Sequence, residues 1–268
     1  MKDKVVIITG ASSGIGLACA KAFAKKGSIV VLAARSEEVL EKLALELDPE
    51  GKRALPVRTD VSVEEDCRKL IEKTLEVYGR IDILINNAGI SMRALFEDAD
   101  IDVLRRVMDV NFWGTVYCTK YALPHLQKSQ GTIAGISSIA GFHGLPGRSA
   151  YSASKFAMHG LLESIRIENI ARKVHVLVIA ASFTASNIRK SALDANGNIQ
   201  GETPRDEEKL ASPDLVAKNV LRSIRKKKRN RIMTLEGQLM VLLQRIIPVL
   251  TDGVIFRKFK REPNSPIK

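Results

Sequence analysis

The stretch Val5-Val-Ile-Ile-Thr-Gly-Ala-Ser-Ser-Gly-Ile-Gly16 decides the fold of this chain. Its apolar start predicts a buried strand over 5–9, and the residues that follow predict a helix over about 15–26. Three glycines separate the two elements: Gly10, Gly14 and Gly16. Glycines in such a turn let the backbone approach a pyrophosphate at the helix N-terminus, where free N–H groups and the helix dipole favour anions. The spacing is G-x-x-x-G-x-G and not the G-x-G-x-x-G dinucleotide fingerprint, so a tight turn without a ligand is the alternative.

Strands and helices alternate along the rest of the chain. Apolar runs predict further strands over 29–34, 53–58, 81–85, 131–136, 174–179 and 231–235, and helices over 63–78, 101–126, 149–171 and 213–225. This alternation predicts an α/β fold with a doubly wound, seven-stranded parallel sheet and helices on both faces. We expect one domain over residues 1–268, because no repeat, low-complexity segment or linker divides the chain. The irregular segment at about 183–211 is expected to be a lid or loop, and about 236–268 form a C-terminal extension.

Composition is that of a globular protein. Of the 268 residues, 45% are hydrophobic and 27% are charged. The cysteines Cys19, Cys67 and Cys118 have no C-x-x-C spacing, which suits a reducing compartment and suggests neither a disulfide nor a zinc site. The four histidines show no metal-ligand spacing, so we expect no metal. Because the first strand begins near residue 4, we expect no signal peptide and a cytoplasmic protein, with membrane association as an alternative.

A basic run lies at 222–231, where seven residues are Lys or Arg and none is acidic; it accounts for seven of the +12 formal net charges. Such a run attracts nucleic acid or an anionic membrane. No aromatic residues are interleaved and no nucleic-acid-binding motif is present, so we expect no nucleic-acid partner. A solvated helix end, where cations suit the C-terminus, is the simpler interpretation.

The C-terminal extension carries two apolar runs, 239–243 and 246–250, and basic residues follow at 257–261. The runs are too short to span a bilayer, which needs about 20 apolar residues. We expect the extension to close the pocket of its own subunit. Peripheral contact with anionic lipid is the alternative, because apolar faces beside cations suit that surface.

Tyr151 and Lys155 form the most informative pair of side chains. They lie four residues apart in Tyr-Ser-Ala-Ser-Lys, within a predicted helix, and this spacing places the phenol and the ammonium on one face. A nearby ammonium favours the phenolate, so we expect it to lower the pKa of Tyr151. A tyrosine with a pKa near neutrality gives or takes a proton at physiological pH. Taken alone, the pair also fits a solvated helix face.

Five short elements of the chain occur together. Thr-Gly-x-x-x-Gly-x-Gly lies at 9–16, Asn-Asn-Ala-Gly at 86–89 and Tyr-x-x-x-Lys at 151–155. Asn111 lies in the predicted middle helix, and Ser138 precedes Tyr151 by thirteen residues. Together these elements resemble the short-chain dehydrogenase/reductase family. The resemblance implies a single Rossmann domain that binds a nicotinamide dinucleotide, with the segment at 183–211 covering the substrate.

The resemblance implies four catalytic residues: Asn111, Ser138, Tyr151 and Lys155. Tyr151 would transfer a proton to or from the substrate oxygen, and Lys155 would hold the nicotinamide ribose and lower the tyrosine pKa. Ser138 would hydrogen-bond the substrate oxygen where charge grows, and Asn111 would help hold a water that links Lys155 to solvent. Considered singly, Ser138 and Asn111 also fit ordinary structural roles.

The cofactor site implied by the resemblance follows the carboxyl ends of the strands. Its expected residues are Gly10, Ser12, Ser13, Gly14, Ile15, Gly16, Arg35, Asp60, Val61, Asn87, Ala88, Gly89, Tyr151, Lys155 and Thr184. After the second strand the chain has Ala34 and Arg35 and no acidic residue, which in a Rossmann domain favours a 2′-phosphate and so predicts NADP(H). The alternative is that Arg35 only precedes a helix for which Ser36 is the N-cap.

The chain departs from the family pattern after the sixth strand. Ala181 and Ser182 stand where Pro-Gly is usual, and Ser186 replaces a threonine. Thr184 falls where a backbone contact to the nicotinamide carboxamide is expected. The change concerns the docking of the nicotinamide end and leaves the catalytic residues intact.

Together these features predict an NADP(H)-dependent oxidoreductase that interconverts a ketone or aldehyde and an alcohol. A resemblance to the 11β-hydroxysteroid dehydrogenase-like branch, in Ala-Arg-Ser at 34–36, Tyr-Ser-Ala-Ser-Lys-Phe-Ala at 151–157 and the basic, apolar tail, implies a hydrophobic substrate. The alternative is a non-catalytic dinucleotide-binding sensor or scaffold, because fold alone does not set function. We also expect a homo-oligomer, a dimer or tetramer, whose long helices supply apolar contacts from Val116, Tyr117, Leu161, Leu162 and Ile165.

Overall fold

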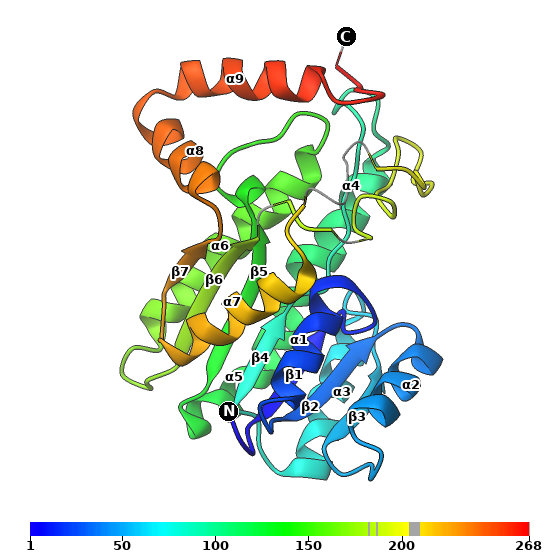
Figure 1. Ribbon diagram of the computed structural model, residues 1–268, viewed down its shortest axis with the longest axis vertical. Helices are drawn as coiled ribbons and strands as arrows, with labels where there is room; N and C mark the ends of the chain where they lie inside the picture. The colour runs from blue at the N-terminus through cyan, green and yellow to red at the C-terminus, as the bar shows by residue number, and fades with distance from the viewer. Residues whose placement is uncertain (182, 186, 204–209, 268) are drawn as a thin grey trace.

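The structure is a computed structural model that describes residues 1–181, 183–185, 187–203 and 210–267. A parallel sheet of seven strands in the order β3-β2-β1-β4-β5-β6-β7 runs through its centre (Figure 1). The strands are β1 (Val5–Thr9), β2 (Ile29–Ala34), β3 (Ala54–Arg58), β4 (Ile83–Asn86), β5 (Thr132–Ser138), β6 (His175–Ala181) and β7 (Asn230–Ile232). The predicted doubly wound α/β fold is confirmed, because the strand order reverses between β1 and β4.

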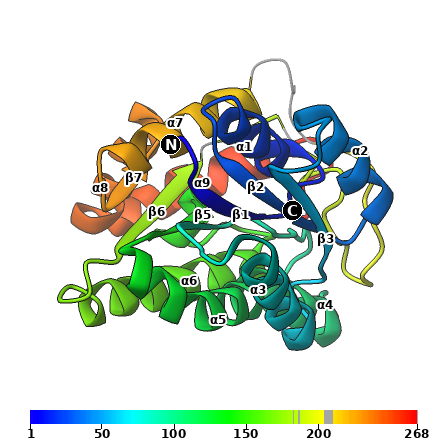
Figure 2. The same cartoon turned by 90° about the horizontal axis from the view of Figure 1, so that it is seen from below.

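Helices cover both faces of the sheet (Figure 2). On one face lie α1 (Gly14–Ala24), α2 (Glu37–Leu47) and α7 (Pro213–Arg225); on the other lie α3 (Glu64–Tyr78), α5 (Gly114–Ser129) and α6 (Ser149–Glu168). Alternate residues of β1 point to the two faces of the sheet. Val6 and Ile8 pack in the core beneath α1, α2 and α7, and Val5 and Ile7 pack in the core beneath α3, α5 and α6. Because both faces are buried, the strands read as continuous apolar runs. The basic run forms the last turn of α7 and the exposed connection to β7, as expected of a solvated helix end.

The middle helix predicted over 101–126 consists of three parts. Helix α4 (Ile101–Met108) leads into a π-helical turn at Asp109–Trp113, and α5 then continues to Ser129. The π turn carries Asn111. Such turns interrupt the regular helical spacing and often occur at functional sites. Hydrophobic periodicity does not signal a one-turn change of this kind.

The C-terminal extension forms two helices, α8 (Leu235–Ile246) and α9 (Pro248–Lys260), which lie beyond the carboxyl ends of the strands (Figure 1). The strand predicted over 231–235 is shorter than expected and ends at Ile232. Thr234 then caps α8, because its Oγ1 accepts a hydrogen bond from Gly237 N at 3.2 Å. In the part of the chain that the structure describes, no helix combines the length and the apolar character that a bilayer crossing requires.

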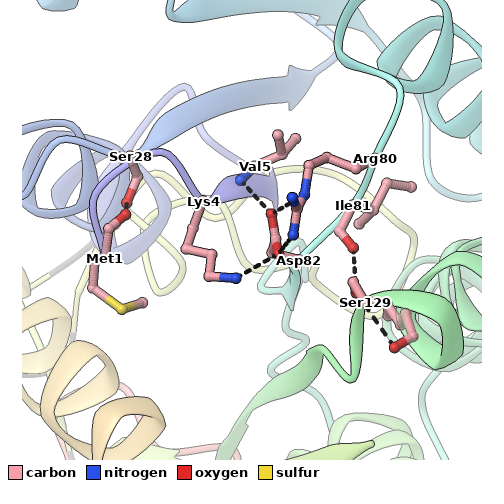
Figure 3. A network of polar contacts seen from close by, with 9 residues as sticks. Met1, Lys4, Val5, Ser28, Arg80, Ile81, Asp82 and Ser129 are labelled. Carbon is pink, nitrogen blue, oxygen red and sulfur yellow. Dashed lines mark hydrogen bonds and ion pairs between the residues drawn. The ribbon is translucent and has the colours of Figure 1, made fainter.

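A polar network ties β1 to the start of β4 at the amino end of the sheet (Figure 3). The Asp82 carboxylate accepts hydrogen bonds from Lys4 Nζ at 2.8 Å, Arg80 Nη2 at 2.6 Å and Val5 N at 3.0 Å. Burial by itself would raise the pKa of Asp82, but these donors outweigh it and hold the pKa below its usual value. The Asp82 side chain is 3% exposed, so this network anchors β1 at the end opposite the site described next.

Candidate active site

A cavity of about 910 Å³ opens at the carboxyl ends of β1 to β6. In doubly wound sheets this is where ligands bind, next to the point at which the strand order reverses. Every predicted site residue except Gly16 and Asn111 lines this cavity. The fold therefore brings together residues that lie between positions 10 and 184 of the chain.

The turn between β1 and α1 requires glycine at two positions. Gly10 has a φ of +67°, and a Cβ atom there would lie 2.9 Å from Ala88 Cα. A Cβ atom at Gly16 would lie 2.1 Å from Gly10 O, so Gly16 sets the packing of the turn against α1 without reaching the cavity. The Ser13 side chain makes no capping hydrogen bond, which leaves the N–H groups of α1 open toward the cavity. This backbone cradle fits the pyrophosphate of a dinucleotide.

Hydrogen bonds between Thr9 and Asn87 join the ends of β1 and β4 beside this turn. Asn87 Nδ2 donates to Thr9 O at 2.8 Å, and Thr9 Oγ1 accepts from the backbone N–H groups of Asn87 and Ala88, both at 3.0 Å. The Asn87 side chain therefore shapes the turn. Thr9 belongs to the glycine-rich motif, but its role in joining the two strands was not predicted, because the partners are 78 and 79 residues apart.

The ends of β2 and β3 supply the polar wall at one end of the cavity. Arg35 lies directly after β2, is exposed and lines the cavity. Asp60 Oδ1 accepts hydrogen bonds from Ser62 N at 3.0 Å and Ser62 Oγ at 2.6 Å. Ser36 occupies the N-cap position of α2, as the alternative interpretation requires, but its side chain makes no capping hydrogen bond. Arg35 and Ser36 thus both lie on the cavity wall.

Ser138, Tyr151 and Lys155 meet on one wall of the cavity, where α6 faces the end of β5. Ser138 Oγ accepts from Ala140 N at 3.2 Å, and Ser138 and Tyr151 both line the cavity. Lys155 Nζ donates to Ile136 O at 3.0 Å and lies 5.6 Å from the centroid of the Tyr151 ring. Lys155 is only 4% exposed. One strand end and one helix thus place a phenol, a hydroxyl and an ammonium together.

Burial decides the acid–base properties of these side chains. It lowers the pKa of Lys155 from 10.5 to about 8. Burial also raises the pKa of Tyr151, although the Ser138 hydroxyl and the charges of Arg148 and Arg189 act in the opposite direction. The expectation of a lowered tyrosine pKa is therefore wrong for this structure. The desolvation of the phenolate outweighs the favourable charges around it.

Asn111 lies behind this wall and is fully buried. Its Oδ1 accepts from Ile90 N at 2.8 Å, and its Nδ2 donates to Ile90 O and to Ser154 Oγ, both at 2.9 Å. Ser154 Oγ in turn donates to Tyr151 O at 2.7 Å. Asn111 thus links the loop after β4 to the helix that carries Tyr151, and its role in holding a water stays a prediction.

The segment at 183–211 and the C-terminal extension form the remaining walls, within the residues that the structure describes. Thr184 lines the cavity as predicted and is 4% exposed. Ser182 and Ser186, at the departure from the family pattern, lie outside the described residues. From the extension, Met240, Lys258 and Phe259 reach the cavity. The expected closure of the pocket by its own subunit is thus confirmed at these positions.

Two arginines that the sequence did not single out also line the cavity near Tyr151. Arg189 Nη2 donates to Thr184 O at 2.7 Å. Arg148 Nη2 donates to Glu262 Oε2 at 3.1 Å, and its guanidinium carbon lies 4.9 Å from the centroid of the Phe259 ring. Arg148 and Glu262 are 114 residues apart. No local pattern signals such a pair.

Comparison with known proteins agrees with this geometry. The family model of the short chain dehydrogenases matches residues 4–197. The chain belongs to the short chain dehydrogenase family. An 11-beta-hydroxysteroid dehydrogenase A from Arachis hypogaea is 42% identical over 214 residues, which are 78% of this chain and 61% of that protein. The chain spans 61% and 64% of the lengths of two plant relatives that it matches.

Solved structures of short chain dehydrogenases share the fold. An alcohol dehydrogenase from Thermococcus sibiricus, complexed with 5-hydroxy-NADP, has a TM-score of 0.76 at 28% identity, covering 87% of this chain and 96% of that one. A 3-ketoacyl-(acyl-carrier-protein) reductase from Brucella melitensis, complexed with NADH, has a TM-score of 0.75 at 25% identity, covering 87% of this chain and 97% of that one. Proteins with this fold thus bind either an NADP derivative or NADH.

Proposed function

We propose that this short chain dehydrogenase is an NADP(H)-dependent oxidoreductase that interconverts a ketone or aldehyde and an alcohol. The proposal is carried by the meeting of Ser138, Tyr151 and buried Lys155 in the same cavity as the Gly10 turn. One cavity thereby joins a proton-transfer group to a cradle for a pyrophosphate. Its volume of about 910 Å³ lies near the upper end of ligand pockets, roughly 300–1,000 Å³, and suits a dinucleotide together with a substrate.

Each residue has a defined part in this proposal. Tyr151 gives a proton to the substrate oxygen in reduction and takes one in oxidation. The Ser138 hydroxyl donates to the same oxygen as negative charge develops on it. Lys155 and the backbone of Thr184 hold the nicotinamide end of the cofactor, and Asn111 supports the loop and helix beside them. The bound cofactor supplies or accepts the hydride.

The choice of NADP(H) rests on Arg35. A guanidinium pairs with the 2′-phosphate that only NADP(H) carries, and an acidic residue at this position would instead favour the free ribose hydroxyls. One solved neighbour is complexed with an NADP derivative and the other with NADH, so the preference has to be measured.

Titration of the wild-type protein with NADPH and NADH tests this preference. We expect NADPH to bind at least about tenfold more tightly, which is roughly 1.4 kcal/mol. Arg35→Ala should remove most of the difference, because it removes the partner of the phosphate. Arg172→Ala, at an exposed arginine that bonds to Gln127, is the matched control and should leave the preference unchanged. Equal or tighter binding of NADH to the wild type would contradict the proposal.

The substrate end of the cavity favours a hydrophobic compound. Apolar side chains line it from α8, α9, the 183–211 segment and the loop after β5: Ile139, Leu145, Phe183, Ile188, Leu193, Ile199, Met240 and Phe259. The name of the Arachis hypogaea relative, 11-beta-hydroxysteroid dehydrogenase A, supports the same class of substrate. We propose a bulky apolar ketone or alcohol.

Turnover across a panel of ketones with NADPH tests the activity. Tyr151→Phe keeps the ring and removes the proton, so kcat should fall by roughly 10²–10⁴. NADPH affinity should change little, which makes cofactor titration the control. A phenylalanine variant with wild-type turnover would end the assignment of Tyr151. Binding of NADPH without turnover of any ketone would instead favour the sensor or scaffold.

We propose that the chain forms a dimer or tetramer through the outer face of α5 and α6. Trp113, the last residue of the π turn before α5, is 43% exposed, and Phe156 of α6 is 45% exposed. Two of the contacts expected from the sequence are wrong, because Leu162 and Ile165 pack in the core beneath α6. Light scattering should give at least twice the chain mass of 29.5 kDa. A monomeric mass at micromolar concentration would count against pairing.

We also propose that α8 and α9 contact anionic lipid. Apolar side chains are exposed along both helices at Leu235, Leu239, Leu242, Ile246, Val249, Leu250, Val254 and Phe256. The last turn of α9 adds the exposed cations Arg257 and Lys260. Apolar side chains beside cations suit the headgroup region. The protein should sediment with anionic vesicles at low salt and be released at high salt; a protein that stays in the supernatant at low salt contradicts this.

A further inference from the structure

The Arg148 guanidinium is held between the helix of Tyr151 and the C-terminal extension. Its bond to Glu262 is 3.1 Å long, and the two side chains are only 11% and 7% exposed. The Phe259 ring lies under the guanidinium at 4.9 Å and is itself 4% exposed. A further hydrogen bond runs from Arg148 Nη1 to Pro146 O at 3.4 Å. The cation is thus oriented from three sides.

Arg148 also has a defined position relative to Tyr151. It is the N-cap residue of α6, three residues before the tyrosine, and its carbonyl accepts from Ser152 N at 2.9 Å. Both side chains line the cavity. Tyr151 packs against the apolar cluster through which α9 docks, which contains Leu145, Ile255 and Phe259.

Apolar contacts also dock the extension. Ile255 and Phe259 already bury apolar surface there, and a buried ion pair is on balance no more stabilising than apolar side chains of similar size. A buried cation does, however, favour a nearby anion strongly, because little solvent screens it. The charge of Arg148 lowers the pKa of Tyr151 against the effect of burial.

We propose that Arg148 is a positioning residue for Tyr151, and that Glu262 and Phe259 of the C-terminal extension orient its guanidinium so that it stabilises the phenolate. The inference rests on the proposed function, in which Tyr151 transfers the proton. It makes the extension part of the acid–base apparatus as well as a wall of the cavity. Glu262 then sets the strength of the effect, because its carboxylate partly neutralises the guanidinium.

Other charged groups surround the pair and stay unchanged in the test. Lys155 lies beside Tyr151 on α6, Arg189 faces it from the 183–211 segment, and Arg93 acts on Arg148 from the loop after β4. The other titratable groups on the cavity wall are Arg35, Asp60, Arg106, Asp109, His143, Glu236 and Lys258.

The pH dependence of alcohol oxidation tests the inference. The probe is the alcohol that corresponds to the best ketone of the panel, with NADP⁺ as the cofactor. Oxidation requires the phenolate, so the ascending limb of kcat/KM against pH follows the pKa of Tyr151. Arg148→Met removes the cation and should move this limb to higher pH by roughly 0.5–1 unit. Arg148→Lys keeps the charge and should restore most of the wild-type position.

Glu262→Gln provides the opposite perturbation. Glutamine keeps an acceptor for Arg148 but removes the neutralising charge, so the limb should move to lower pH. Arg105→Met, at an exposed arginine of α4 paired with Asp102, is the matched control and should not shift it. A merely structural role for the pair predicts lower stability in both variants without shifts of opposite sign.

The outcomes separate this inference from the proposed function. If Tyr151→Phe is inactive and neither Arg148→Met nor Glu262→Gln moves the limb, the inference fails while the proposed function stands. If no ketone is turned over, both fail. If Arg148→Met does not fold, the other variants decide. Glu262→Gln must still move the ascending limb of kcat/KM to lower pH. A limb at unchanged or higher pH overturns the inference.

Discussion

Replacing Lys155 by methionine should stabilise the protein and remove its proposed activity. The ammonium is 4% exposed and lies against the Tyr151 ring and Ile136 O. Methionine has a similar length and no charge, so it fits the same space without the cost of desolvation. The substitution therefore separates the function of the lysine from its effect on stability.

The magnitude follows from the pKa of Lys155. Burial lowers it from 10.5 to about 8. At about 1.36 kcal/mol for each pKa unit, keeping the ammonium buried at neutral pH costs roughly 3 kcal/mol. Methionine avoids this cost but loses the hydrogen bond to Ile136 O, which is worth about 0.5–1.5 kcal/mol. We expect a net gain of roughly 2 kcal/mol in the free energy of unfolding at pH 7.

The gain should depend on pH in a defined direction. Between about pH 8 and 10.5 the folded protein binds fewer protons at Lys155 than the unfolded chain does. The stability of the wild type therefore rises over this window, as the lysine becomes neutral in both states. The advantage of Lys155→Met should shrink over the same window and vanish or reverse by its upper end.

Urea unfolding followed by circular dichroism at pH 7 and pH 10 measures these differences. Lys120→Met, at an exposed lysine of α5, is the control and should change the free energy of unfolding by no more than about 0.5 kcal/mol at either pH. A Lys155→Met protein that is less stable than the wild type at pH 7 would refute the reasoning. An advantage that is equal at both pH values would refute it as well.

Three further predictions concern other parts of the molecule. Gly16→Ala should weaken NADPH binding by more than tenfold in calorimetric titration, because its Cβ atom would lie 2.1 Å from Gly10 O and displace the turn; an unchanged Kd contradicts this. Asp82→Asn should lower the free energy of unfolding at pH 7 by roughly 2–3 kcal/mol, and this deficit should disappear in acid. The reason is that folding lowers the pKa of Asp82. The ionised carboxylate therefore stabilises the fold above the ordinary aspartate pKa, and this stabilisation is lost as the pH falls through the pKa of the folded state. A deficit that persists at pH 2 argues against this explanation. Trp113→Lys should halve the mass seen by light scattering, because it places a charge on the exposed surface at the start of α5, and an unchanged mass would exclude this surface as the interface.

Much of the fold follows from short-range patterns. The bounds of β1, β2 and α7 coincide with those predicted, because each is a local run bounded by glycine, a turn or a capping serine. Most of the residues that line the cavity could be predicted in a similar way. The carboxyl ends of parallel strands lie at one edge of the sheet, so the residues that follow those strands lie close together.

Long-range contacts were not predictable in this way. The bonds of Asn111 to Ile90 and Ser154 and the bond between Arg148 and Glu262 join elements far apart in the chain. The direction of the pKa of Tyr151 was also wrong from the sequence. A spacing of four residues shows that an ammonium is near, but it does not show how much water surrounds the phenol.

The sequence by itself therefore determined the architecture and the family, and it predicted Tyr151 as the proton-transfer group. Periodicity, glycine positions and helical spacing are local properties, and they can be read one segment at a time. Only the tertiary structure decided which charges lie buried beside Tyr151 and which segment closes the cavity. The reason is that the free energy of a charge depends on its whole surroundings, and at this site those surroundings come from α6, β5, the 183–211 segment and the C-terminal extension.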